Sequence, residues 1–169
     1  AARYRNRDVD IPFALGLHGP LQFDEAIWSL APVGVALRGD GVIPDLDARG
    51  ALALGRRLVL QLHGRLQDWP EAWPSLPPPI GTSNAPLPFA LDYVGNPALD
   101  DAASLQLTRG TARFDGRFRL PEVLAWMDVA QGSPIPPLKG RITAKMVEIS
   151  GGKLEGVDVR IDDAETAVP

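Results

Sequence analysis

The stretch Leu62-His63-Gly64-Arg65-Leu66 carries the pattern that decides the fold of this chain. It reads apolar, polar, glycine, arginine, apolar, and three more stretches repeat that order, with proline in place of arginine in one of them: Leu17-His18-Gly19-Pro20-Leu21, Phe114-Asp115-Gly116-Arg117-Phe118 and Leu138-Lys139-Gly140-Arg141-Ile142. Alternate residues of a β-strand lie on the same face. Each of these glycine phrases therefore places its glycine and both large apolar side chains on one face. Because glycine inside a strand often marks a bend or a close backbone approach, the repeat predicts a sheet that curls around an apolar interior.

Apolar and polar residues alternate over much of the remaining chain, for example over 58–66, 141–146 and 157–162. This period of two is typical of an antiparallel sheet with one buried face. We predict a mostly β protein of about ten antiparallel strands, arranged as a strongly curved meander or an incomplete barrel. The alternative is a closed β-sandwich, in which the same apolar faces form an ordinary core.

Two short helices are predicted, at 67–73 and 121–130. Pro121 suits a first helical turn, and the residues after it form an apolar stripe. Their tryptophans are expected to plug one end of the interior as core, with a gate or a membrane-interface anchor as the alternative: Trp69, Trp73 and Trp126.

The chain is expected to form a single β domain over 1–169. Within it, the order strand, short helix, proline-rich loop, strand occurs at 57–95 and again at 111–149, which is a weak internal repeat. The apolar residues of the alternating stretches change from even to odd positions at 146–147 and again at 154–157. A bulge or a bend would account for each change.

Composition excludes several classes of protein. The chain has 169 residues, no cysteine, two histidines and a net charge of −4. Without cysteine there is no disulfide framework, thiolate metal site or cysteine nucleophile, and the acidic balance argues against a nucleic-acid partner. No apolar run approaches the ~20 residues that a membrane-spanning helix needs. The first residue is not methionine, and we expect a soluble segment of a longer protein.

No set of residues with recognisable catalytic or metal-binding spacing is present. His18 and His63 occupy matching polar positions and fit surface histidines better than a metal pair that lacks a third ligand. Asp45-Leu46-Asp47 resembles the start of a calcium loop, but Arg49 stands where the third acidic ligand belongs. We therefore expect neither an enzyme nor a bound metal or cofactor.

Two candidate surfaces follow from the alternation. The apolar interior is predicted to form a groove for an alkyl chain, with these residues on its wall: Leu15, Leu17, Leu60, Leu62, Leu91, Phe114, Phe118 and Ile142. A set of basic residues is the candidate rim for anionic head groups, with a solvated sheet face as the alternative: Arg113, Arg117, Arg119, Lys139 and Arg141.

Several stretches together resemble the C-terminal region of AsmA-family proteins: 138–144, 147–151, 154–159, 46–52 and 114–118. This resemblance implies a bacterial envelope protein with an inner-membrane anchor and a periplasmic body. It also implies a β-groove with an apolar interior that takes part in phospholipid transport and outer-membrane biogenesis, as is thought for the family and its TamB-like relatives. No catalytic residues are implied.

The leading functional hypothesis is a non-enzymatic lipid-handling segment whose partner is a phospholipid or another alkyl-chain ligand. The second hypothesis is a structural module whose exposed sheet edges pair with envelope β-proteins and assist outer-membrane protein assembly. Weak self-association through those edges is expected in either case.

Overall fold

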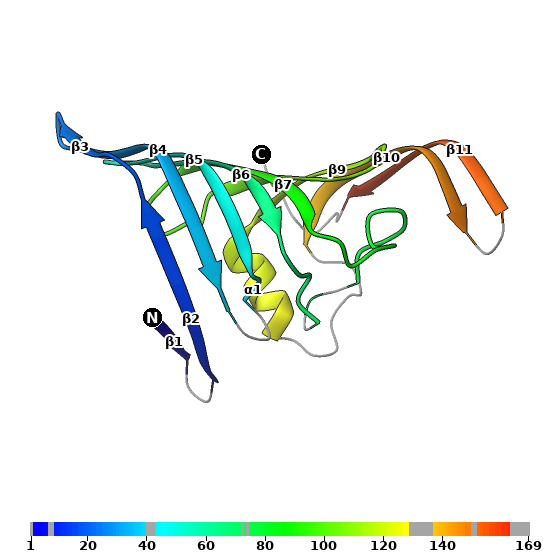
Figure 1. Ribbon diagram of the computed structural model, residues 1–169, viewed down its shortest axis with the longest axis horizontal. Helices are drawn as coiled ribbons and strands as arrows, with labels where there is room; N and C mark the ends of the chain where they lie inside the picture. The colour runs from blue at the N-terminus through cyan, green and yellow to red at the C-terminus, as the bar shows by residue number, and fades with distance from the viewer. Residues whose placement is uncertain are drawn as a thin grey trace.

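The computed structural model describes residues 2–6, 9–39, 43–71, 73, 75–128, 137–149 and 152–162. These residues form one large sheet and one short helix (Figure 1). The elements are, in chain order, β1 (Ala2–Asn6), β2 (Val9–His18), β3 (Leu21–Asp24), β4 (Ile27–Arg38), β5 (Leu46–Leu54), β6 (Leu58–Leu66), β7 (Leu87–Gly95), β8 (Ala102–Arg109), β9 (Ala112–Arg119), α1 (Leu120–Asp128), β10 (Leu138–Ile149) and β11 (Gly152–Asp162).

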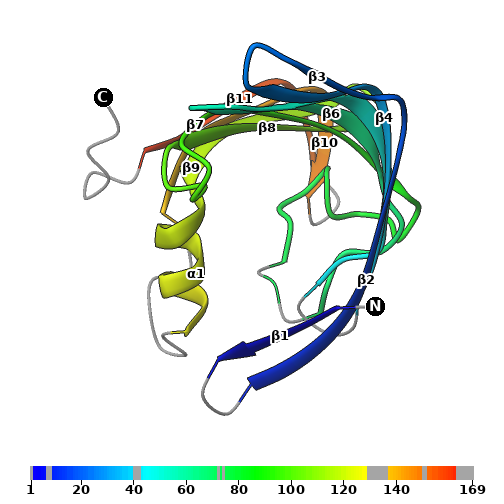
Figure 2. The same ribbon diagram turned by 90° about the vertical axis from the view of Figure 1, so that its left-hand side faces the viewer.

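The sheet is an antiparallel meander. Ten strands follow one another in the order β1-β2-β4-β5-β6-β7-β8-β9-β10-β11, and β3 pairs with β4 beside β2. The sheet does not close, and it bends into an arch with α1 and the β6–β7 connection on its inner side (Figure 2). The prediction of a curved meander is confirmed, and the closed sandwich is wrong because the described strands form a single sheet.

Three of the four glycine phrases lie inside strands, as predicted. The third and fourth lie side by side, with Gly116 opposite Gly140 and Phe114 opposite Ile142. The phrase at 17–21 differs, because Gly19 falls between β2 and β3 rather than within a strand. A Cβ atom added to Gly19 would lie 2.3 Å from the carbonyl oxygen of Pro32, so the chain uses this glycine for a close approach at a bend.

The curvature of the sheet depends on glycine at two places in β5 and β6. A Cβ atom added to Gly50 would lie 1.7 Å from the carbonyl oxygen of Gln61, and one added to Gly64 would lie 2.1 Å from that of Asp47. Real Cβ atoms do not approach carbonyl oxygens so closely. Only glycine therefore lets β5 and β6 bend this tightly against each other.

The two helix predictions have different outcomes. The predicted helix at 121–130 is confirmed as α1, with 129–130 outside the described residues. The predicted helix at 67–73 is wrong: the described part of this segment is bends and one turn, closed by a 3.0 Å hydrogen bond from the Trp73 amide to the Pro70 carbonyl. A segment this short does not recover the cost of helix nucleation unless packing holds it in a helix.

The hydrophobic core lies on the inner face, under β6 to β10. The β6–β7 connection covers this part of the sheet and contributes fully buried Ile80, while Leu76 and Trp69 pack against the same cluster. From the strands the cluster takes Leu66, Leu87, Phe89, Leu107, Ala112, Ala144 and Val147. The interior is therefore filled by the chain itself beneath these strands, and the predicted plug by Trp69 is part of that filling.

Shifts in the strand alternation keep the apolar residues on the inner face of the sheet. In β10, Ala144 and Val147 are both buried while Met146 between them is exposed, which matches the predicted change at 146–147. A further shift was not predicted: the pairing of β4 with β5 slips between Leu30 and Val33. Because of this slip, residues on both sides of it face the interior.

We predict that Gly64→Ala lowers the free energy of unfolding by about 2 kcal/mol, because the added methyl group collides with backbone that cannot move cheaply. Gly16→Ala in β2 is the matched control, since its methyl group would meet nothing nearer than 3.8 Å. Urea unfolding followed by tryptophan fluorescence measures both. Equal stability of the two variants would contradict this account of the curvature.

Candidate functional site

The eight residues predicted to line a groove all lie on the inner face of the sheet. The register of the strands connects them in rows. One row crosses eight strands: Leu17, Val35, Ala48, Gly64, Phe89, Leu107, Phe114 and Ile142. The other candidates lie in neighbouring rows. Leu15 lies in one row, and Leu62 and Leu91 face each other in a second row. Leu60 and Phe118 lie in a third row. The inner face is thus continuously apolar from β2 to β10.

Exposure divides this face into a filled part and an open part. Ile142 is buried, and Leu62, Leu91 and Phe114 are half-buried against the core cluster. Leu60 and Phe118 are also half-buried. The remaining two candidates, Leu15 and Leu17, are exposed. A ligand that contacts the inner face would therefore meet it at the β2 end, where the described residues do not cover it.

The uncovered part extends beyond the two leucines of β2. Six large apolar side chains, each more than a third exposed, share the inner face here, and we call them the open apolar patch: Leu15, Leu17, Leu21, Phe23, Trp28 and Leu54. The rings of Phe23 and Trp28 stack across β3 and β4 with their centroids 4.5 Å apart.

Sequence reasoning missed four members of the open apolar patch, Leu21, Phe23, Trp28 and Leu54. The turn between β3 and β4 is formed by Glu25 and Ala26, both with positive φ angles. Such a two-residue turn is normally recognised by asparagine and glycine, neither of which is present here. The alternation of Leu21 and Phe23 with polar neighbours was the available signal.

The five basic residues predicted as a head-group rim lie on the other, polar face of the sheet. Four of them have acidic neighbours: Arg113 with Asp115, Arg119 with Glu122, Lys139 with Asp162 and Arg141 with Asp158. The fifth, Arg117, has no ion pair within the described ranges. The thickness of the sheet separates these cations from the leucines of the inner face. They do not form a rim around that face.

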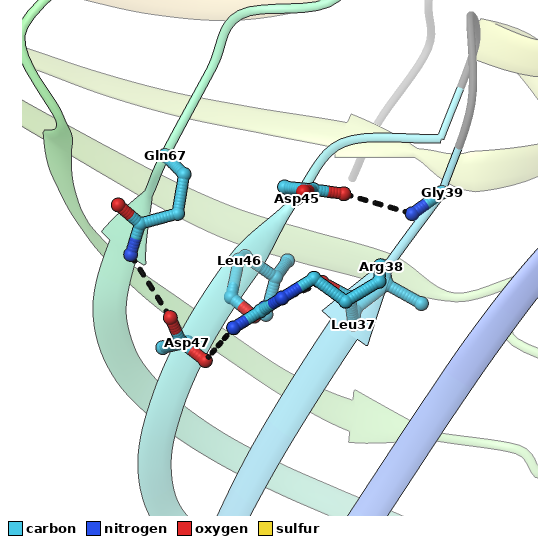
Figure 3. A network of polar contacts seen from close by, with 7 residues as sticks. All are labelled: Leu37, Arg38, Gly39, Asp45, Leu46, Asp47 and Gln67. Carbon is cyan, nitrogen blue, oxygen red and sulfur yellow. Dashed lines mark hydrogen bonds and ion pairs between the residues drawn. The ribbon is translucent and has the colours of Figure 1, made fainter.

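A polar network joins β4, β5 and the start of the β6–β7 connection (Figure 3). The Asp47 carboxylate accepts hydrogen bonds from Arg38 Nη2 at 2.7 Å and from Gln67 Nε2 at 2.9 Å. The guanidinium of Arg38 holds the pKa of Asp47 below its ordinary value. Asp45 accepts a hydrogen bond from the Gly39 amide at 2.9 Å. Asp45 and Asp47, the two carboxylates of the stretch that resembles a calcium loop, thus bind to neighbouring parts of the chain.

Several of the histidine and tryptophan residues singled out in the sequence pack against neighbouring parts of the chain. The imidazole of His18 lies over Gly34 on the neighbouring strand, where a Cβ atom would collide with it. Trp69 and Trp73 pack edge to face with their centroids 5.0 Å apart, and Trp126 lies on α1. Among the described residues, no three histidine or acidic side chains are grouped so that they could hold a metal ion.

The comparisons with known proteins show no relative. No protein family, curated protein or solved structure matches this chain. Within the described ranges, no helix has the length and apolar character required to span a membrane.

We predict that the stability of the fold falls as Asp115 becomes protonated. Arg113 Nε donates to both oxygens of this carboxylate, at 2.9 and 2.7 Å, and holds the pKa of Asp115 below its ordinary value; Gln106 lowers it further. The pair therefore stabilises the fold above about pH 4, the range of an unfolded aspartate, and this stabilisation is lost as pH falls through the lower folded pKa.

Titration of the carboxyl carbon by NMR measures this shift. Arg113→Gln should raise the pKa of Asp115 toward its ordinary value, whereas Arg117→Gln, on the same strand and face, should leave it nearly unchanged. An unchanged pKa in Arg113→Gln would contradict the assignment of the shift to this pair.

Proposed function

We propose that this chain is a non-enzymatic segment that holds an alkyl chain against the inner face of its sheet. The supporting observation is the open apolar patch, which continues without a polar break into the filled part of the interior. Contiguous exposed apolar side chains on a curved surface are typical of sites that bind lipids or proteins. The most exposed members lie on β2 and β3, so the ligand enters at this end of the arch.

Burial of apolar surface drives this binding. Each methylene that leaves water contributes about 0.8 kcal/mol, so an acyl chain that covers several leucines gains enough to offset the cost of its own ordering.

The resemblance to the AsmA family gives this proposal a cellular setting. In that setting the chain is the periplasmic part of an inner-membrane-anchored protein of the bacterial envelope, and the ligand is a phospholipid on its way to the outer membrane. The basic residues of the polar face have no part in this proposal, because they lie on the side of the sheet that faces away from the alkyl chain.

We predict that the chain binds cis-parinaric acid, a fluorescent fatty acid, and that Leu17→Asp weakens this binding at least tenfold. Loss of the contact with one large apolar side chain is worth about 1.5–3 kcal/mol, and a buried charge adds to the loss. Leu17 is 48% exposed, so the substitution should leave the fold intact.

Val94→Asp is the matched control, because Val94 is 49% exposed but lies on the polar face. Native mass spectrometry of protein purified from membranes should also detect bound phospholipid in the parent chain and less in Leu17→Asp. Equal weakening by the two substitutions, or no binding by the folded parent chain, would overturn the proposal.

A second candidate function is supported by the open ends of the sheet. Within the part of the chain that the structure describes, β11 pairs only with β10, and most of its residues are exposed. An unpaired strand edge is a template for strand addition. We propose that this edge pairs with neighbouring β-proteins or with another copy of the chain.

We predict weak self-association of the chain, detected by sedimentation velocity over a wide range of concentration. Val159→Lys on β11 should reduce the association, because a lysine on an edge strand opposes pairing. Leu17→Asp should leave it unchanged if the edge carries it. A parent chain that stays monomeric at every concentration, or one in which only Leu17→Asp reduces association, would contradict the role of the edge.

A further inference from the structure

The polar face carries a hollow of about 430 Å³ over β7, β8, β9 and β10. Its floor includes the backbone of Gly116 and Gly140, which are paired directly across β9 and β10. Ala90 and Ser104 on the neighbouring strands have small side chains. The hollow lies on the opposite side of the sheet from the open apolar patch. Anything bound in it is therefore independent of the proposed alkyl-chain site.

Two of the charged residues that line this hollow are already neutralised. Asp115 receives both of its strong hydrogen bonds from Arg113. Arg141 donates through Nε and Nη2 to the two carboxylate oxygens of Asp158. These two pairs frame the hollow but have little charge left for a ligand.

The remaining charges follow one row across the sheet. Asp92, Ser104, Arg117 and Lys139 are successive cross-strand partners on β7 to β10. Asp92 and Arg117 have no ion pair within the part of the chain that the structure describes. Lys139 is only loosely engaged, with Nζ 3.8 Å from an oxygen of Asp162, whose side chain is 73% exposed.

This row has an unfavourable charge arrangement. Arg117 and Lys139 face each other directly, and like charges at opposed positions destabilise a sheet. An anionic group between them would relieve the repulsion. Asp92, at the other side of the hollow, lies two strands from Arg117, with Ser104 between them, and it would accept a cation in the same way.

We propose that the hollow binds a small zwitterion, with its carboxylate or phosphoryl group at Arg117 and Lys139 and its ammonium group at Asp92. Two strand spacings separate Asp92 from Arg117 by about 9.6 Å. Strand side chains stand roughly perpendicular to the sheet, and each charged contact takes about 2.8 Å, so the charges of the ligand lie about 4 Å apart. This is the span of a β-amino acid or a similar short aminoalkyl anion.

The test uses β-alanine as the probe, with propionate and propylamine as analogues that each keep one of its two charges. Binding is followed by the ¹H–¹⁵N NMR spectrum of the chain, which also shows that each variant is folded. β-Alanine should bind about two- to fivefold more tightly than propionate, the ratio that one additional exposed ion pair gives, and the amide shifts should map to β7–β10.

Variants assign the two ends of the ligand. Arg117→Gln should weaken β-alanine binding about two- to fivefold, and Asp92→Asn should reduce it to the level of propionate. Arg49→Gln removes the same charge from the same face at β5, outside the hollow, and should have little effect. Equal binding of β-alanine and propionate, equal effects of Arg117→Gln and Arg49→Gln, or no binding to the folded parent chain would overturn the proposal.

Discussion

The burial of one face of an open sheet is the constraint on which the rest of this structure depends. A sheet with alternating apolar and polar residues must cover its apolar face, and here no second sheet does so among the described residues. Curvature brings part of the face together, and the β6–β7 connection inserts Leu76 and Ile80 beneath β6 to β10. Among the described residues this cover ends before β2 and β3, so the open apolar patch results directly from the way the core is built.

Glycine makes that curvature compatible with regular pairing. Gly50 and Gly64 lie where the backbones of β5 and β6 approach most closely, and the strands keep their register through both positions. Gly116 and Gly140 act differently, since the ring of Phe114 lies over both of them on the inner face. The same residue type thus permits a tight bend in one half of the sheet and makes room for an aromatic ring in the other.

The sequence predicted the features that depend on local alternation and missed those that depend on an irregular backbone. The strands, α1 and the common face of the eight groove residues follow from a period of two and a short apolar stripe. The open apolar patch did not follow, because the Glu25–Ala26 turn and the slip in β4 break the usual signals. The alternation also predicts that the cations lie on the polar face, and their positions in β9 and β10 agree with the alternative of a solvated sheet face rather than with a rim.

The two faces of the sheet differ in how their side chains find partners, and this difference separates the two proposed sites. On the inner face the filled part is stabilised by contacts within the chain, and what remains exposed is uniformly apolar, so only an apolar partner lowers its free energy. On the polar face many charges are paired with neighbours on the same strand or on the next one, as in Arg113–Asp115 within β9 and Arg141–Asp158 across β10 and β11. Two charges that have no ion pair among the described residues, Asp92 and Arg117, line one hollow, where small residues leave space beside them. A substitution on one face therefore reaches the other only through the shared backbone, which makes the two sites separable by mutation.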